Sequence, residues 1–281
     1  MMVTTLVITS GPFALGQAGP KVVVIVMENA AYSRIIGNPN ASYINSLRTT
    51  GKLFTNYTAI TPGSLHNYLA MTSGLTSVDS PSQANIFQAV DDSGGADTWI
   101  SFQESMAGSC GQRSAARVPG TSVHLYDQGH DPAYHLRRDE SCAKHDIPMT
   151  RASFNPVALP TFSFITPNTC DDMHTLPTGG RPCPAFFGSN PGSNAVKMGD
   201  NWLRVVVPRL LSQPDVTVVI TWDEGTAGEH VVTLEVGAGV TAGSSSSSPY
   251  NHYSLEAGLY SSLGLGKAPN HGANATPLPI P

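Results

Sequence analysis

Acidic and amide side chains directly follow two strongly apolar runs of this sequence. Glu28 and Asn29 come after KVVVIVM, and Asp223 and Glu224 come after VTVVITW. If both runs are neighbouring parallel strands, their carboxyl ends open onto one crevice. Carboxylates gathered there repel one another unless a cation lies between them, and oxygen ligands of this kind suit Mg, Mn, Ca or Zn. The pattern therefore predicts a site for a divalent metal ion.

A third apolar run, TFSFIT, leads into a segment that carries Asp171, Asp172 and His174. Taken alone, each of these polar groups has an ordinary alternative, as a solvated turn or a strand-to-loop pair, because polar residues are common at strand ends. Taken together, the three segments favour a functional site, since all of them would face the same crevice.

Ser64 is the candidate nucleophile, in the segment TPGSLHNY between an expected strand and an expected helix. A metal and the helix dipole can activate a hydroxyl at a helix start, and nearby backbone N–H groups can hold a phosphate. The alternative is that Ser64 only caps the helix. His66 is two residues away and is expected to point elsewhere. The sequence has no G-x-S-x-G motif, which argues against α/β-hydrolase chemistry.

The elements that would position these groups alternate along the chain. Strands are expected at 21–27, 53–60, 96–103, 161–166, 216–222 and 230–236. Helices are expected at 40–51, 67–73, 201–211 and 254–263, with a kink at Pro208. This alternation predicts an α/β fold with a doubly wound, mostly parallel central sheet flanked by helices, in one catalytic domain over residues 21–266.

Three segments are expected to lie outside this pattern. Residues 107–156 are predicted to be irregular, and Ser244–Ser248 is predicted to be a flexible loop. The Pro/Ala-rich segment 267–281 is predicted to be a disordered tail.

The charge balance excludes some classes of partner. Only 12% of the residues are charged, and 15 Lys and Arg against 20 Asp and Glu leave a net charge of −5. Binding of nucleic acid through phosphate neutralisation is therefore not expected. The chain contains no stretch of about 18 apolar residues, so we expect no integral membrane segment.

The N-terminus and the cysteines bear on localisation. Residues 1–20 end in small residues but lack a positively charged start, and they resemble a leader or the remnant of a signal peptide. The four cysteines form no C-x-x-C pair, which argues against structural zinc. They are Cys110, Cys142, Cys170 and Cys183. Three pairings are open, and the short separations favour 110 with 142 and 170 with 183, against the alternative of four free thiols. Together these features favour a secreted or cell-surface protein.

In seven segments the sequence resembles the bacterial phosphoesterase family of the alkaline phosphatase superfamily, which contains acid phosphatases and phospholipase C enzymes. The segments are Val22–Asn29, Ile35–Leu47, Ser64–Gly74, Leu159–His174, Val219–Gly225, His230–Gly243 and Tyr250–Leu265. They occur in the family's order and cover most of residues 21–266. The resemblance implies an alkaline phosphatase-like fold.

The resemblance also implies roles for the matched positions. Ser64 would be the catalytic nucleophile, and Asn67 would help to bind the phosphoryl group. The implied metal ligands are Glu28, Asn29, Asp223 and Glu224. The implied lining of the site, as ligands or phosphate contacts, is Asp172, His174, His252 and His130.

Two positions depart from the family pattern. His66 stands where relatives usually carry proline. The superfamily's D-H-G motif appears as Asp223-Glu224-Gly225, so a full two-zinc ligand set is not assumed. His230 is a candidate replacement for the missing imidazole, and its alternative is the first residue of a strand.

The sequence therefore predicts a metal-dependent phosphoester hydrolase. The expected activity is that of an acid phosphatase, which acts on small phosphomonoesters through a phosphoserine on Ser64, with His174 or His252 protonating the leaving group. One alternative is a phospholipase C-like phosphodiesterase. Another is a non-catalytic secreted protein on the same scaffold. A sulfatase is disfavoured, because the chain has no C-x-P-x-R or S-x-P-x-R motif.

Overall fold

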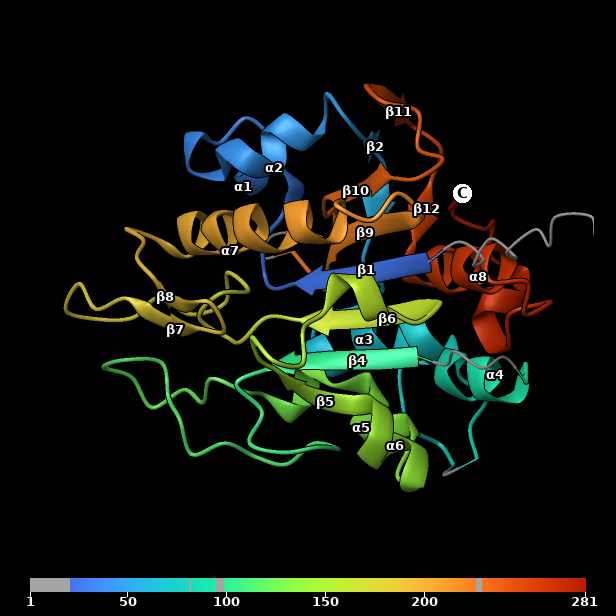
Figure 1. The fold of residues 1–281 in the computed structure, drawn as a ribbon. Helices are drawn as coiled ribbons and strands as arrows, with labels where there is room; N and C mark the ends of the chain where they lie inside the picture. Colours follow the sequence, from blue (N-terminus) through green and yellow to red (C-terminus); the bar gives the residue numbers. More distant parts are fainter. Residues whose placement is uncertain (1–20, 81, 95–98, 226–228) are drawn as a thin grey trace, which may run out of the picture.

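A mixed eight-stranded sheet forms the centre of the protein (Figure 1). The computed structural model describes residues 21–80, 82–94, 99–225 and 229–281. The strand order is β11-β2-β10-β9-β1-β6-β4-β5. These strands are β1 (Lys21–Met27), β2 (Lys52–Phe54), β4 (Trp99–Glu104), β5 (Asp146–Met149), β6 (Phe162–Thr166), β9 (Val216–Trp222), β10 (Thr233–Gly237) and β11 (Ser244–Ser246). Within this sheet β10 runs antiparallel to both of its neighbours, and the other strand pairs are parallel. The predicted α/β class and mostly parallel sheet are confirmed.

The middle of the sheet is apolar on both faces. Val22 to Met27 of β1 are fully buried, and β1 pairs in register with β9 along its whole length and with β6 on its other side. Continuous β-branched runs are typical of strands covered on both faces. Every residue of β6 is also buried, because β6 lies in the interior of the sheet, which is covered on both faces.

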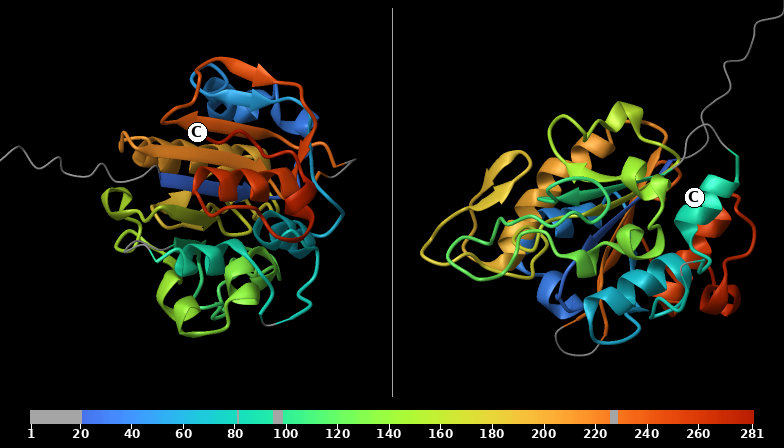
Figure 2. Two further views of the ribbon diagram at one scale, coloured as in Figure 1. Left: turned by 90° about the vertical axis from the view of Figure 1, so that its right-hand side faces the viewer. Right: turned by 90° about the horizontal axis from the view of Figure 1, so that it is seen from below.

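Helices cover both faces of the sheet (Figure 2). One face carries α3 (Ser64–Ser73), α4 (Ile86–Asp92) and α8 (His252–Ser262), which contact one another. The other face carries α7 (Ala195–Leu210), which packs on α2 (Ser42–Leu47). The remaining helices are α1 (Tyr32–Ile35), α5 (Pro132–Leu136) and α6 (Glu140–His145), with 3-10 turns η1 (Pro39–Ala41), η2 (Gln128–His130), η3 (Pro156–Ala158) and η4 (Asn270–Asn274). None of the described helices is long and apolar enough to cross a membrane.

Two small sheets complete the structure. Parallel β3 (Tyr57–Thr58) and β12 (Tyr250–Asn251) form one, and antiparallel β7 (Cys183–Ala185) and β8 (Gly188–Asn190) form a hairpin. The expected strand at 53–60 is thus divided between β2 and β3, which belong to different sheets.

Several boundaries differ from the sequence-based expectation. The helix expected at 40–51 is only η1 and α2, because β2 begins at Lys52 and contributes to the sheet. In contrast α7 starts at Ala195, where Asn194 caps it by accepting a hydrogen bond from the Lys197 N–H. Pro208 lies inside its last turn.

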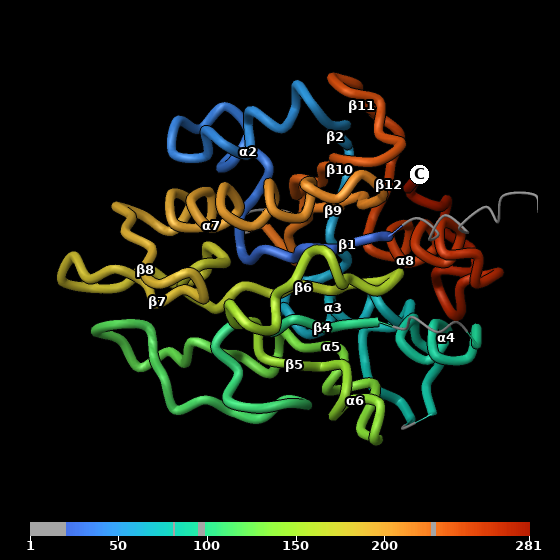
Figure 3. Tube along the Cα trace, viewed as in Figure 1, coloured from blue at the N-terminus to red at the C-terminus, as the bar shows by residue number. Residues whose placement is uncertain are grey.

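Three segments predicted to be irregular, flexible or disordered differ from that expectation in whole or in part. Residues 107–127 form only turns and isolated bridges, as predicted, but the rest of 107–156 contains α5, α6 and the edge strand β5. Pro148 is tolerated in β5 because only one side of this strand is paired. Ser244–Ser246 is strand β11, which pairs with β2. The segment 267–281 returns over α8 and buries Leu278, whose N–H donates to the Ser254 carbonyl (Figure 3). Residues 1–20, predicted to be a leader, lie outside the described residues.

Both predicted disulfides are present. Cys110 is joined to Cys142, and Cys170 is joined to Cys183. The first connects a long loop to α6, and the second connects the loop after β6 to the β7–β8 hairpin.

Glu256 on α8 makes stability depend on pH. It is fully buried, and neither carboxyl oxygen has a hydrogen-bond partner among the described residues. Burial raises the pKa of Glu256 to about 9. The folded protein therefore keeps a proton that the unfolded chain releases above pH ~4.3, so stability falls as pH rises from there toward the folded pKa. We expect Glu256→Gln to be about 1 to 4 kcal/mol more stable than the native protein at pH 8, with little difference at pH 4.

Urea unfolding at pH 4, 6 and 8 measures this effect. Glu140→Gln is the matched control, because Glu140 is exposed on α6 and should leave the pH slope unchanged. The same slope in Glu256→Gln as in the native protein would contradict the expectation.

Candidate active site

The carboxyl ends of β9, β1 and β6 lie side by side, since these three strands are parallel neighbours (Figure 1). The residues that follow them meet there. The Asn29 N–H donates to Asp223 Oδ1 at 3.0 Å, and the Glu28 N–H donates to the Asp172 carbonyl at 2.8 Å. The convergence predicted from the strand ends is therefore present, with groups from three segments far apart in the sequence.

Ser64 directs its hydroxyl into this cluster. Its Oγ donates to Glu28 Oε2 at 2.9 Å, and Asn29 Nδ2 donates to the same oxygen at 3.0 Å. Ser64 is the first residue of α3, and Gly63 holds the N-cap position. The alternative of a capping serine is thus not what the structure shows, because the hydroxyl donates to Glu28, the residue after β1, rather than bonding to its own helix.

The turn before Ser64 is held from two sides. The Gly63 N–H donates to Glu224 Oε2 at 2.6 Å, and Gly63 has a φ of 103°, where a side chain would be strained. From the helix, Asn67 Nδ2 donates to the carbonyls of Thr61 and Gly63 at 2.6 and 3.3 Å. Asn67 Oδ1 accepts from the Ile60 N–H at 3.0 Å.

These contacts bear on two predicted roles. Asn67 is completely buried, and its amide is occupied in fixing the turn that presents Ser64. Glu224, predicted as a metal ligand, holds the same turn through Gly63. Both residues therefore hold the turn that presents Ser64 in this structure, and this turn takes up both the oxygen and the nitrogen of the Asn67 amide.

His130 lies between two of the acidic residues. Its Nε2 is 3.5 Å from Glu28 Oε2, and its Nδ1 is 3.6 Å from Asp172 Oδ2. Burial lowers the pKa of His130 to about 4, so the ring is neutral at physiological pH. The ring stacks on Tyr68 with centroids 5.5 Å apart, and the His174 ring lies 6.1 Å away.

Tyr68 was not anticipated as a site residue. It is completely buried and supports His130 from α3. The sequence held a signal, because Tyr68 follows Ser64 by four residues and therefore shares its helix face.

The carboxyl groups of the site are strongly perturbed. Burial raises the pKa of Glu28 well above its usual range, and the nearby Asp223 and Asp172 raise it further. Burial also raises the pKa of Asp223 to about 7 and that of Asp172 well above its ordinary value. Buried acids that share one site hold protons or bind a cation, because they cannot all ionise unaided.

The donor chemistry of this cluster fits a divalent cation. Glu28 Oε1, Asp172 Oδ2 and Asp223 Oδ2 are buried and have no hydrogen-bond partner within the described part of the chain. Unpartnered carboxylate oxygens are what Mg, Mn or Ca ions take as ligands. No group of three or more His, Cys, Asp or Glu side chains in residues 21–80, 82–94, 99–225 and 229–281 surrounds a single point closely enough to hold an ion. The fit of the site to a divalent cation therefore rests on the unpartnered carboxylate oxygens, and not on a set of ligands already arranged around one point.

The two histidines predicted as acids differ in their surroundings. His252 is completely buried, and its Nε2 lies 2.6 Å from the Asp223 carbonyl. Because a carbonyl only accepts, Nε2 carries the proton, and Nδ1 accepts from the Tyr57 hydroxyl at 3.0 Å. Burial lowers the pKa of His252 to about 4. His252 thus holds the backbone of Asp223. His174, in contrast, is exposed, and its Nδ1 lies 2.7 Å from Thr175 Oγ1.

Two other histidines have partners away from the carboxylates. His66 Nδ1 lies 2.6 Å from the Thr76 carbonyl, as its spacing from Ser64 suggested. His230, considered as a replacement ligand, stacks on Tyr32 and places Nε2 3.0 Å from the Thr55 carbonyl.

Known proteins resemble this chain in sequence and in fold. A phosphatidylinositol-3-phosphatase of Mycobacterium tuberculosis is 27% identical, over 92% of this chain and 81% of the relative. A phosphate-repressible acid phosphatase of Penicillium chrysogenum is 26% identical over 89% of this chain, which spans only 60% of that protein's length. The solved structure of an alkaline phosphatase superfamily protein of Vibrio parahaemolyticus matches with a TM-score of 0.53 at 17% identity, over 89% of this chain and 67% of that one. No protein-family model matches the sequence.

Proposed function

Because the chain has the fold of the alkaline phosphatase superfamily, we propose that it is a phosphoester hydrolase with Ser64 as its nucleophile. The observation that carries this proposal is the Ser64 hydroxyl, which donates to Glu28 at the head of α3. The two curated relatives are named as phosphatases, which supports phosphate rather than sulfate esters. The intact acidic cluster argues against a non-catalytic protein on this scaffold.

In the proposed reaction Ser64 Oγ gives its proton to Glu28 Oε2, with which it already shares a hydrogen bond, and attacks the phosphorus in line. The ester P–O bond breaks, the alcohol leaves with a proton from the acid described below, and a phosphoserine remains. Water then attacks the phosphoserine, which releases phosphate and restores the serine hydroxyl. The free N–H groups in the first turn of α3, at the positive end of its dipole, stabilise the phosphoryl oxygens. Asn67 and Glu224 keep that turn in place.

The leaving group needs a proton, and His174 is the residue proposed to supply it. Its ring is exposed beside the site, whereas both nitrogens of His252 are engaged.

A divalent metal ion would be held by Glu28, Asn29 and Asp223, with Asp172 and Glu224 beside them. It would offset the repulsion among these carboxylates and polarise a phosphoryl oxygen. The Asn29 N–H would keep the Asp223 carboxylate oriented toward it, and His252 would hold the Asp223 backbone through its carbonyl.

The proposed substrates are small phosphomonoesters, which is the acid phosphatase assignment. A dianionic monoester gains more from the helix N-terminus than a monoanionic diester does. We propose that the protein works outside the cytoplasm, at the cell surface or as a secreted enzyme, and its two disulfides support that location.

A substrate panel tests this assignment. We expect kcat/KM for p-nitrophenyl phosphate to exceed that for bis-p-nitrophenyl phosphate by about 100-fold or more, with p-nitrophenyl sulfate slower still. Initial rates at pH 5 and pH 7 with one enzyme preparation provide the comparison. Faster release of phosphocholine from phosphatidylcholine than of phosphate from the monoester would instead favour the phospholipase C-like alternative.

A further inference from the structure

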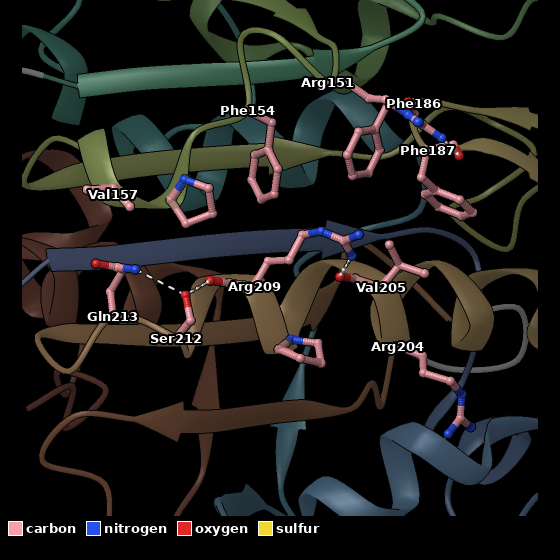
Figure 4. Close-up of a pocket in the computed structure, with 12 residues that line it drawn as sticks. Arg151, Phe154, Val157, Phe186, Phe187, Arg204, Val205, Arg209, Ser212 and Gln213 are labelled. Carbon is pink, nitrogen blue, oxygen red and sulfur yellow. Dashed lines mark hydrogen bonds between the residues drawn. The ribbon is translucent and has the colours of Figure 1, made fainter.

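A groove of about 800 Å³ opens on the face of the sheet that carries α7 (Figure 4). It runs between α7 and the segment 151–157, and it ends at Phe186 and Phe187 beside the turn of the β7–β8 hairpin. Ser64 belongs to α3, on the opposite face of the sheet (Figure 2). The groove is therefore separate from the candidate active site. Its volume is within the range of small-molecule sites.

The groove exists because this face of the sheet is incompletely covered. Helix α7 covers it near β9, whereas toward β6 and β4 the covering consists of 151–157 and the three-residue turn η3. A doubly wound sheet usually has a helix in such a place.

The lining is rich in apolar side chains. Phe154, Phe186 and Phe187 form a row with successive ring centroids 5.5 and 5.4 Å apart. At the other end lies Val157, which is 71% exposed, the highest value among the exposed large hydrophobic residues of the described chain. Phe154 is mostly buried and Phe186 and Phe187 are partly buried, so the apolar surface open to water lies chiefly at Val157 and at the two phenylalanines of the hairpin. Apolar and aromatic walls of this kind are typical of small-molecule sites.

Two arginines along the groove have no acidic partner. Arg151 donates to the carbonyls of Phe186 and Phe187, and Arg209 donates to the Val205 carbonyl of its own helix. Neither forms an ion pair with a carboxylate in the described residues, and no acidic side chain among them lines the groove. The chain as a whole has a net charge of −5, so this positive lining is a local feature that complements an anion.

Arg204 also borders the groove, but its guanidinium group is already paired with a carboxylate. It pairs with Asp200 at 3.2 Å and donates to Ser42. Figure 4 shows its side chain turned away from the other labelled residues. The cations available to a ligand are therefore Arg151 and Arg209.

A ligand in this groove can form few hydrogen bonds with the backbone beneath it. The strands beneath the groove, β1 and β6, are each paired on both sides, so an extended peptide finds no strand edge to join. An acyl chain has no such requirement, and it gains from aromatic and aliphatic walls. A carboxylate head suits the fork of an arginine, which can bind it with two parallel hydrogen bonds.

We propose that this groove binds one long-chain fatty acid, with the acyl chain along Phe154 and Val157 and the carboxylate on Arg151 or Arg209. This site is independent of the phosphoester hydrolase assignment, and neither arginine belongs to the active site.

Titration calorimetry of the full chain with dodecanoate below its micelle concentration tests the proposal. We expect saturable binding of one dodecanoate per chain, and weaker binding of octanoate and of the cationic dodecyltrimethylammonium. The double variant Arg151→Gln/Arg209→Gln should bind dodecanoate about tenfold more weakly or worse. Arg48→Gln is its control, because Arg48 is exposed at the C-cap of α2 and does not line the groove.

A second pair of variants protects the test against misfolding. Val157→Asp places a carboxylate at an already exposed position and should weaken dodecanoate binding through repulsion. Val78→Asp makes the same change at an exposed valine elsewhere and should leave binding unchanged. All variants should keep the native circular dichroism spectrum, which shows that they are folded without relying on any activity.

Four results would overturn the proposal. These are no saturable binding, equal binding of the cationic detergent, undiminished binding in the double arginine variant, and equal effects of Val157→Asp and Val78→Asp. Concentration-dependent dimerisation that Val157→Asp abolishes would show that a second copy covers the groove, and it would overturn the proposal as well.

Discussion

Ser64→Ala is expected to reduce turnover of p-nitrophenyl phosphate by a factor on the order of 10⁴ or more. The substitution removes the only atom proposed to bond to phosphorus, and the carboxylates beside it cannot take its place in line. Steady-state kinetics measures the loss, and rapid quenching with labelled substrate detects the phosphoserine that the native enzyme alone should form. Folding should persist, because Ser64 is only partly buried and loses one hydrogen bond, worth about 1 kcal/mol.

Ser73→Ala is the matched control for this experiment. Ser73 ends the same helix, and its buried hydroxyl donates to the Leu69 carbonyl and accepts from Gln83 Nε2, away from the site. The Ser73→Ala variant should therefore lose at least as much stability as Ser64→Ala and still keep its kcat. A Ser64→Ala variant with a native circular dichroism spectrum and native turnover would disprove the assignment of the nucleophile.

Removal of divalent ions with EDTA is expected to abolish activity, and one divalent cation should restore it. The Tm of the metal-stripped protein is a second readout, and it does not depend on turnover. Because Glu28, Asp172 and Asp223 are buried and each has an unpartnered oxygen within the described chain, the added cation should raise the Tm of the stripped protein. A cation at 100 times its Kd contributes about 2.7 kcal/mol of stability. Calorimetry of the stripped protein with Mg, Mn, Ca and Zn identifies which ion acts.

Three variants test whether the rise in Tm on adding metal comes from the acidic cluster. Glu28→Gln and Asp223→Asn should each eliminate most of the rise in Tm on adding metal. Glu235→Gln should retain the rise in Tm. Glu235 is also buried and its carboxyl oxygens have no hydrogen-bond partner in the described chain, but it lies within β10, opposite Lys52 in the register with β2, and not in the acidic cluster. No rise in Tm with any divalent ion, together with activity that survives EDTA, would refute the proposed metal requirement.

The centre of the fold could be predicted because its signals are local. The runs of β1 and β9 are continuous and β-branched, and Gly74 ends α3 in the left-handed conformation expected of a helix C-cap. Because the carboxyl ends of neighbouring parallel strands lie at the same edge of a sheet, Glu28 after β1 and Asp223 after β9 could be expected to meet there. Their contact through Asn29 follows from the parallel register.

The peripheral elements were mispredicted because their structure is decided by distant partners. Ser244–Ser246 has no strand propensity of its own and becomes β11 only because β2 offers an edge. Likewise the closing segment is ordered through Leu278, which packs into the main core beside α8. Neither partner can be recognised from the segment itself.

The roles of several site residues were also hidden from the sequence. Motif position indicated that Asn67 and His252 belong to the site, yet both are saturated by hydrogen bonds to the backbone or to Tyr57. Whether a polar side chain faces a substrate or the protein depends on rotamers and on buried partners, and a motif contains no information on either.

The Cys170–Cys183 bond has a consequence for the acidic cluster. It joins the loop that carries Asp172 to the β7–β8 hairpin, and in this loop Met173 has a φ of 86°, a conformation that costs a non-glycine residue about 1 to 3 kcal/mol. A cross-link over a loop of this length stabilises by roughly 3 kcal/mol, which can offset that cost. Reduction of this bond is therefore expected to weaken the placement of Asp172 beside His130, whereas the strands of the central sheet, which contain no cysteine, should keep their pairing.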